Sequence, residues 1–422
     1  MAFHKTVLKN GLRIITVPQK STQAVTVLAL VGTGSKYETR DISGISHFLE
    51  HMYFKGTKKR PNPIAVSETL DKIGGIYNAF TSEEYTGYFA KVAAPHFETA
   101  LDWVSDIFLN STLKKEEIKK EKGVIIEEIN MRCDNPMLHI QSLWGNLLYG
   151  DQPAGWDIAG TKETVNGVTR KKLSDYMEKQ YVASNTIICI SGNVSNTTAV
   201  KKAKKYFAKI RKTESFKSLS VKDEQSEPKL LLSFRETDQA HLYLGVRAYN
   251  LSHPKRYSQQ LLGVVLGGMM SSRLFIRIRE KMGAAYYIAT DSSANPDTGY
   301  LAVRAGVDGK KIEKVISAIL QELKKISREK VSPKELKKVK DCIKGKTTLL
   351  LEASDAQASF YTSQELLEKK ILTLKQIFNK IDKVSSADIL ETAKDIFKTE
   401  QLNLAIIGPF KDEKKFNKLL KF

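Results

Sequence analysis

An internal repeat limits the folds open to this chain more than any other feature of its sequence. Three pairs of segments match in the same order along the chain: 88–108 with 300–320, 117–120 with 335–338, and 185–192 with 403–408. The first pair aligns without gaps and places Tyr88 opposite Tyr300. Chance explains one such match but rarely three in register, so we expect two halves of similar structure.

The strand and helix patterns place both halves in the α+β class. We expect a hairpin around Asn10-Gly11, because this pair supplies the positive φ angles of a tight turn. Apolar periodicity predicts these further elements of the first half: strands 6–8, 12–17 and 25–31, and helices 43–54, 63–73, 97–110 and 114–132. Each half is expected to be an antiparallel sheet backed by helices.

The length of 422 residues suits more than one domain. We predict an N-terminal half 1–212, a linker 213–228 and a homologous C-terminal half 229–422. The linker belongs to the polar run 211–228, whose composition is typical of an exposed connection.

The net charge of +20 arises from 67 Lys and Arg against 47 Asp and Glu. In the Lys-rich segments 114–122 and 334–344, acidic or apolar residues recur at helical spacing, which is typical of a solvated helix face. Neither segment has the interleaved aromatic residues that stack on bases. We therefore expect no nucleic-acid partner, and nucleic-acid binding stays an alternative motivated by charge alone.

The cysteines and the apolar segments bear on location. Cys133, Cys189 and Cys342 are an odd number without CxxC spacing, which predicts neither a disulfide framework nor a cysteine zinc site. Residues 1–20 lack the apolar region of a signal peptide, and no apolar stretch approaches the length of a membrane span. We expect a cytoplasmic protein without a membrane partner.

The segment His47-Phe48-Leu49-Glu50-His51 carries the chemistry. His47 and His51 are four residues apart, so on a helix both imidazoles project from one face and can share a metal ion. Imidazole nitrogen suits zinc, and Glu50 beside them can act as a general base. In a chain with 7 His, an HxxEH segment is expected by chance roughly 0.007 times, so two incidental histidines are a poor explanation.

HxxEH is the inverzincin signature, and the segment His47 to Thr57 (HFLEHMYFKGT) resembles the M16 zinc peptidases. This group includes mitochondrial processing peptidase, pitrilysin and insulin-degrading enzyme, and the chain is similar in size to the short processing-peptidase-like subfamily. The similarity extends over essentially the whole length. It implies two homologous halves that form a clamshell around a central cleft, with one Zn²⁺ per chain.

The resemblance also implies a third metal ligand far downstream. The segment Glu121 to Ile129 (EKGVIIEEI) is similar to the family region that supplies it, with the ligand at Glu128. Glu121 matches the acid that orients a ligating histidine. Positions 121 and 128 lie two turns apart on one helix face, whereas adjacent Glu127 points about 100° away and remains a fallback.

In the second half, residues 266–286 resemble the family's Gly-rich stretch and the helix after it. The resemblance assigns Arg279 and Tyr286 to the peptide carbonyl, where they would stabilise the tetrahedral oxyanion. An ordinary surface arginine and core tyrosine are the alternative. The family usually has a third glycine where this chain has Met269.

Residues 74–81 (GGIYNAFT) resemble the family's edge strand, onto which substrate adds as a further strand. The matching substrate-binding residues are Asn78, Ala79 and Phe80. Strand addition reads mostly the main chain, which predicts broad specificity for extended or unfolded peptides. A Gly-Gly turn before an ordinary strand is the alternative.

The preferred hypothesis is a zinc metalloendopeptidase in which His47, His51 and Glu128 hold the metal and Glu50 is the base. A non-catalytic scaffold subunit of the same fold, paired with an active chain, is the alternative. Because the chain retains both the metal residues and the Arg279/Tyr286 pair, we expect peptide substrates and a homodimer.

Overall fold

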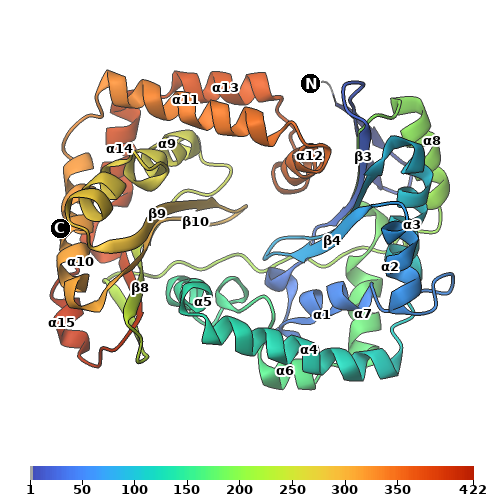
Figure 1. Cartoon of the computed structure of the whole chain (residues 1–422), viewed down its shortest axis with the longest axis horizontal. Helices are drawn as coiled ribbons and strands as arrows, with labels where there is room; N and C mark the ends of the chain where they lie inside the picture. The colour runs from blue at the N-terminus through green and yellow to red at the C-terminus, as the bar shows by residue number, and fades with distance from the viewer. Residues whose placement is uncertain (1–2) are drawn as a thin grey trace. The chain divides into compact units, whose positions relative to one another are not determined.

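The computed structural model of the chain describes residues 3–422 and divides into two compact units (Figure 1). Unit 1 comprises the chain up to Asn130 together with Trp156–Leu219 and Thr348–Thr373. Unit 2 comprises Met131–Gly155, Ser220–Thr347 and Leu374–Phe422. Each unit therefore combines segments that are distant in sequence.

Unit 1 is built on a six-stranded sheet of order β1-β2-β6-β3-β5-β4. Its strands are β1 (His4–Val7), β2 (Arg13–Pro18), β3 (Ala24–Val31), β4 (Ile76–Thr81), β5 (Thr86–Ala93) and β6 (Thr186–Gly192). Its helices are α1 (Ile45–Met52), α2 (Pro63–Asp71), α3 (Phe97–Asn110), α4 (Lys115–Asp134, which ends in unit 2), α6 (Lys162–Asn166), α7 (Arg170–Gln180), α8 (Asn196–Tyr206) and α12 (Ser354–Glu368).

Both faces of the unit 1 sheet are covered, because β3 is apolar on both sides. Alternate residues Val25, Val27, Ala29 and Val31 join a large core with α1 and α3, while Leu28 and Leu30 join a second core with α12. Strand alternation sends neighbouring side chains to opposite faces, so an almost uninterrupted apolar strand lies centrally between two layers.

Unit 2 repeats this plan with a five-stranded sheet of order β7-β11-β8-β10-β9. Its strands are β7 (Lys229–Phe234), β8 (Gln239–Arg247), β9 (Ala285–Ala294), β10 (Gly299–Asp308) and β11 (Leu402–Gly408). Its helices are α5 (Pro136–Tyr149), α9 (Arg256–Gly267), α10 (Ile312–Ile326), α11 (Pro333–Leu350, whose end lies in unit 1), α13 (Leu374–Lys383), α14 (Ser386–Ile396) and α15 (Glu413–Asn417).

The internal repeat of the sequence is confirmed by these elements. Segment 88–108 forms most of β5 and α3, and its match 300–320 forms most of β10 and the start of α10. The third pair of matching segments forms β6 and β11, each of which is the fourth strand counted from the edge strand β4 or β9 of its sheet. The prediction of fully antiparallel sheets was wrong in one respect, since β2–β6 and β7–β11 pair in parallel. A long crossover separates the two strands of each pair, which a parallel connection requires.

One helix of each unit comes from the other half of the sequence. In α12, Ala358, Tyr361 and Leu366 pack on the unit 1 sheet. In α5, Ile140, Trp144 and Leu148 pack on the unit 2 sheet beside Tyr243 and Ala405. The two compact units thus differ from contiguous halves of the sequence by two exchanged helices.

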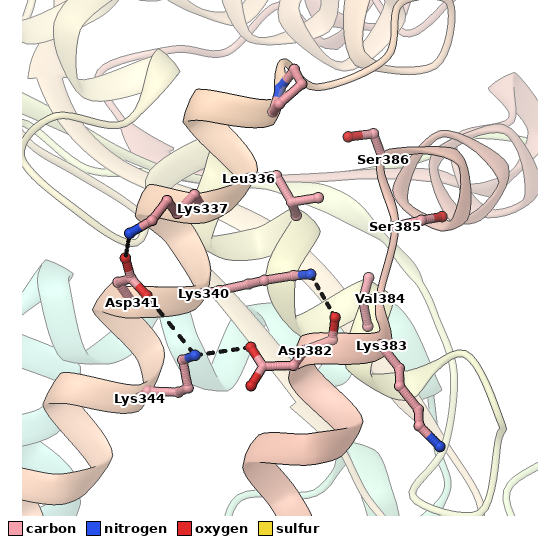
Figure 2. Close-up of a pocket in the computed structure, with 11 residues that line it drawn as sticks. Leu336, Lys337, Lys340, Asp341, Lys344, Asp382, Lys383, Val384, Ser385 and Ser386 are labelled. Atoms are coloured by element: carbon pink, nitrogen blue, oxygen red, sulfur yellow. Dashed lines mark hydrogen bonds and ion pairs between the residues drawn. The ribbon is translucent and has the colours of Figure 1, made fainter.

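The Lys-rich segment 334–344 lies within α11 and lines a cavity of about 650 Å³ with the end of α13 and the start of α14 (Figure 2). Lys344 Nζ lies 2.8 Å from Asp382 Oδ1, and Lys337 Nζ lies 2.6 Å from Asp341 Oδ2. Lys340 Nζ donates to the main-chain oxygen of Asp382 at 2.8 Å. Two of these lysines thus form ion pairs, and the third donates a hydrogen bond to the last turn of α13.

The predicted helices and strands agree closely with the structure. The helix expected at 97–110 is α3 with the same bounds, and the strand expected at 25–31 is β3 with one residue added. Gly11 has φ +86°, as the predicted hairpin turn requires. None of the helices between residues 3 and 422 combines the length and apolar character that a bilayer span requires.

Candidate metal centre

Helix α1 presents both histidines of the HxxEH segment. Its buried residues are Ile45, Ser46, Phe48, Leu49 and Met52, which face the core of unit 1. At 3.6 residues per turn, His47 and His51 then share the opposite side of the helix. The side chains of His47 and His51 are 12% and 20% exposed. The apolar spacing of this short helix thus turns both rings toward a partly open site.

Glu128 on α4 completes a three-residue cluster with the two histidines, and candidate ligand atoms of all three lie within 4.8 Å of one another. The Nε2 atoms of His47 and His51 are 3.3 Å apart, and Glu128 Oε2 lies 3.5 and 3.6 Å from them. Ligand atoms at zinc distances of about 2.0–2.1 Å in a tetrahedron are roughly 3.3–3.4 Å apart. The donor set and its spacing fit a zinc ion with a fourth position left for water.

Glu121, one of the few buried residues of α4, fixes the orientation of His51. Its Oε1 atom lies 2.8 Å from His51 Nδ1, and its Oε2 atom lies 2.7 Å from Lys55 Nζ. Burial opposes ionisation of Glu121, but hydrogen bonds from His51 and Lys55 prevail and lower its pKa. The ionised carboxylate holds the proton on Nδ1, which leaves the Nε2 lone pair of His51 facing the cluster.

Glu50 lies next to the cluster and contacts the edge strand β4. Thr81 Oγ1 donates a hydrogen bond to Glu50 Oε2 at 2.5 Å. Burial raises the pKa of Glu50 above its ordinary value, and the Thr81 hydrogen bond and the neighbouring His51 offset part of this rise. A carboxyl group with a raised pKa suits a residue that exchanges protons near neutral pH.

Strand β4 is the outermost strand of its sheet and pairs only with β5 among the described residues. Asn78 is exposed, and its Oδ1 atom accepts a hydrogen bond from the Ala79 N–H at 2.9 Å. Ala79 is buried in the main core, whereas Phe80 packs on the opposite face toward α12. The outer edge of β4 therefore offers backbone groups to an added strand.

Arg279 and Tyr286 belong to unit 2. Arg279 is exposed on the π-helix η6 (Phe275–Lys281), and its guanidinium carbon lies 5.0 Å from the centroid of the Phe275 ring. Tyr286 is 59% exposed on β9. Met269 packs against the core of unit 2. The structure leaves the side chains of Arg279 and Tyr286 accessible in unit 2.

Comparisons with known proteins bear on the family of the chain. A family model described as insulinase (peptidase family M16) matches residues 13–162, and one described as peptidase M16 inactive domain matches residues 167–342. The uncharacterized zinc protease YmxG of Bacillus subtilis is 36% identical over 401 residues, which cover 95% of this chain and 97% of that protein. The chain belongs to peptidase family M16. An uncharacterized zinc protease of Rickettsia felis is 34% identical, with 96% of this chain and 98% of that protein covered.

Solved structures share the M16 fold across nearly the whole chain. A protease from Helicobacter pylori matches with a TM-score of 0.90 at 23% identity and covers 97% of this chain and 99% of its own. A peptidase M16 inactive domain from Pseudomonas fluorescens has a TM-score of 0.90 at 15% identity, with 97% and 98% covered. The expectation of two sheets backed by helices is therefore confirmed.

Sequence reasoning missed three residues around the M16 metal cluster: Thr81 beside Glu50, Lys55 beside Glu121, and Glu38, which contacts the start of α1. Lys55 and Thr81 lie within the segments quoted for the M16 resemblance, yet nothing in their spacing indicates a contact. Glu127 accepts a hydrogen bond from Asn130 at 3.4 Å and is outside the cluster, which favours Glu128 as the third candidate ligand.

Proposed function

We propose that this M16 protein is a zinc-dependent metalloendopeptidase that cleaves extended or unfolded peptides. The observation that carries the proposal is the cluster of His47, His51 and Glu128, with Glu50 adjacent and held by Thr81. Two imidazoles, one carboxylate and a nearby unligated acid are the set that hydrolytic zinc sites use. The description of the relatives as zinc proteases supports it further.

Each residue of the cluster has a distinct role in this proposal. His47, His51 and Glu128 hold one Zn²⁺, and Glu121 keeps His51 in the tautomer that binds it. When bound, zinc would act as a Lewis acid and lower the pKa of a water molecule bound to it to about 7. Glu50 accepts the proton of the attacking water and delivers it to the leaving amine.

The substrate is proposed to add to the outer edge of β4, where main-chain groups near Asn78, Ala79 and Phe80 bind the peptide backbone. Arg279 and Tyr286 are proposed to bind the reacting carbonyl and stabilise its oxyanion on closure of the two halves. Both side chains are accessible in unit 2, which supports this role. The clamshell arrangement remains part of the proposal.

The proposal includes a cytoplasmic homodimer without nucleic-acid or membrane partners. The three free cysteines, Cys133, Cys189 and Cys342, support a reducing compartment. Light scattering of the purified chain tests the dimer. A monomer at micromolar concentration would remove that part of the proposal and leave the chemistry intact.

Cleavage of a mixed peptide library, with and without a chelator, tests the activity. We expect cleavage that the chelator abolishes and added zinc restores, and we expect Glu50→Gln to keep zinc yet lose cleavage. A fully active Glu50→Gln protein would refute the role of Glu50.

A non-catalytic scaffold subunit is the second candidate, because the family model matching residues 167–342 is described as an inactive domain. A solved chain of complex III2 from Candida albicans also shares the fold, with a TM-score of 0.83. Elemental analysis separates the two candidates. One zinc per chain supports the enzyme, whereas a purified chain without zinc or cleavage supports the scaffold.

A further inference from the structure

Glu38 is a buried acid that contacts the first turn of the metal-binding helix. It is 3% exposed, although it lies outside α1 in the loop that precedes the helix. The Gly44 N–H donates to Glu38 Oε2 at 2.6 Å, and the Ser46 N–H donates to Glu38 Oε1 at 2.8 Å. One carboxyl group thus satisfies two main-chain donors at the start of α1.

This contact is important because α1 is short and has no ordinary side-chain cap. The helix spans eight residues, and its N-cap Gly44 has φ +89° and no side chain to accept the first N–H groups. Those donors have no partner within a helix and need an acceptor when buried. Glu38 supplies this acceptor from the preceding loop.

A buried hydrogen-bond network continues from the same turn. Ser46 Oγ lies 2.8 Å from the Tyr176 hydroxyl, which lies 2.7 Å from Thr33 Oγ1. Thr33, Ser46 and Tyr176 are all almost fully buried. The first turn of α1 is therefore fixed to α7 and to the end of β3.

The loop that carries Glu38 also holds the turn between β4 and β5. Lys36 Nζ lies 2.7 Å from Glu84 Oε1, and their side chains are 2% and 5% exposed. The Lys36 N–H donates to the Glu83 main-chain oxygen at 3.0 Å. A side chain at Gly34 would approach the Ser82 main-chain oxygen to 2.0 Å, so the two segments are in close contact. One loop thus contacts both the metal-binding helix and the turn that directly follows Thr81, the residue that donates a hydrogen bond to Glu50.

We infer that Glu38 is a positioning residue of the active site, which fixes the first turn of α1 and thereby the ring positions of His47 and His51. The inference rests on the proposed zinc peptidase function. His47 directly follows Ser46, so a shift of the first turn moves its ring as well. Metal–ligand distances in a well-formed site lie within about 0.2 Å of their usual values, and a misplacement of about 1 Å can lower a rate roughly a hundredfold.

The test compares Glu38→Gln with Glu365→Gln in the full-length protein. Gln preserves the shape of Glu38, but its amide nitrogen cannot accept an N–H group. Glu365 is a matched control in the same unit: it is 3% exposed on α12, forms a 2.6 Å ion pair with Lys5, and does not belong to the network at α1. The measurements are zinc affinity by chelator competition, the visible spectrum of the cobalt-substituted protein, and kcat and KM for a fluorogenic peptide.

For Glu38→Gln we expect about 10-fold to 100-fold weaker zinc binding, an altered cobalt spectrum, and a lower kcat at saturating zinc with KM nearly unchanged. Glu365→Gln is expected to lower stability and change none of these. Unchanged zinc affinity and kcat in Glu38→Gln would overturn the inference, as would equal losses in both variants.

Three further outcomes each have a defined interpretation. If Glu38→Gln does not fold, Glu38→Asp withdraws the same carboxyl group from the Gly44 and Ser46 N–H groups by one methylene, and the same measurements decide. A wild-type chain that binds zinc without cleaving peptides overturns the proposed function alone, because zinc affinity and the cobalt spectrum still test Glu38. A wild-type chain that binds no zinc overturns both.

Discussion

Replacing Thr81 by valine removes one hydroxyl group beside the proposed base and changes little else. The hydroxyl donates to Glu50 Oε2 at 2.5 Å, and valine has nearly the same shape but no donor. A hydrogen bond to a charged group contributes about 1.5–3 kcal/mol, which equals roughly 10-fold to 150-fold in an equilibrium constant. If this bond holds Glu50 in its productive rotamer, Thr81→Val lowers kcat by up to that factor. Zinc affinity stays constant, because Thr81 contacts no ligand of the cluster.

The assay is the initial rate of a fluorogenic peptide at saturating zinc. Thr81→Ser keeps the donor and should retain most of the activity. Thr26→Val is a matched control, since Thr26 is buried on β3 of the same sheet and its hydroxyl lies 2.8 Å from Ser354 Oγ instead. A Thr81→Val enzyme with the same kcat as Thr81→Ser would refute the positioning of Glu50 by Thr81.

Four further outcomes are expected. Glu128→Gln should abolish stoichiometric zinc binding while Glu127→Gln retains it, and elemental analysis showing the reverse would exchange their roles. Glu121→Gln should weaken zinc binding about 10-fold to 100-fold in chelator competition, and unchanged affinity would contradict its role. Burial raises the pKa of Glu38 from 4.5 to about 8. Between these values the native metal-free protein holds a proton that the unfolded chain has lost, so its unfolding free energy should fall as pH rises, by up to about 1.4 kcal/mol per pH unit. Urea unfolding checks this, and a wild-type slope equal to that of Glu38→Gln would contradict it. Gly123 lies within α4, where a glycine is less stable than an alanine, and an added Cβ meets no atom within 4 Å. Gly123→Ala should therefore raise the unfolding free energy by about 0.5–1 kcal/mol, and a lower denaturation midpoint would refute this.

Features set by local physics could be predicted from the sequence. The Asn10-Gly11 turn follows from the positive φ that Gly11 adopts, and α3 follows from one apolar stripe. His47 and His51 are on one helix face because they are four residues apart. Such features depend on neighbours within a few residues, so their spacing in the sequence is sufficient.

Features set by long-range packing could not be predicted in this way. The apolar side of α12 shows that the helix is buried, but it does not show that its partner is the sheet of unit 1. Thr81 and Glu50 are 31 residues apart, and their contact depends on how β4 packs beside α1. The pairing of Glu128 with His47 was suggested by a family resemblance and by the two-turn spacing from Glu121, because α4 otherwise has the charge pattern of a solvated helix.

The alternation of side chains along β4 connects substrate binding with catalysis. Ala79 points into the core that contains α1, whereas Asn78 and Phe80 point to the other face. Thr81 shares the face of Ala79 and reaches Glu50 from there. Because a shift of one residue in strand pairing exchanges the two faces, a peptide added to β4 can bind in steps of two residues without reversing its side chains. Cleavage products of a peptide in which apolar and polar residues alternate should therefore differ in length by even numbers of residues. Products that differ by single residues would show that the register on β4 does not set the cleavage position.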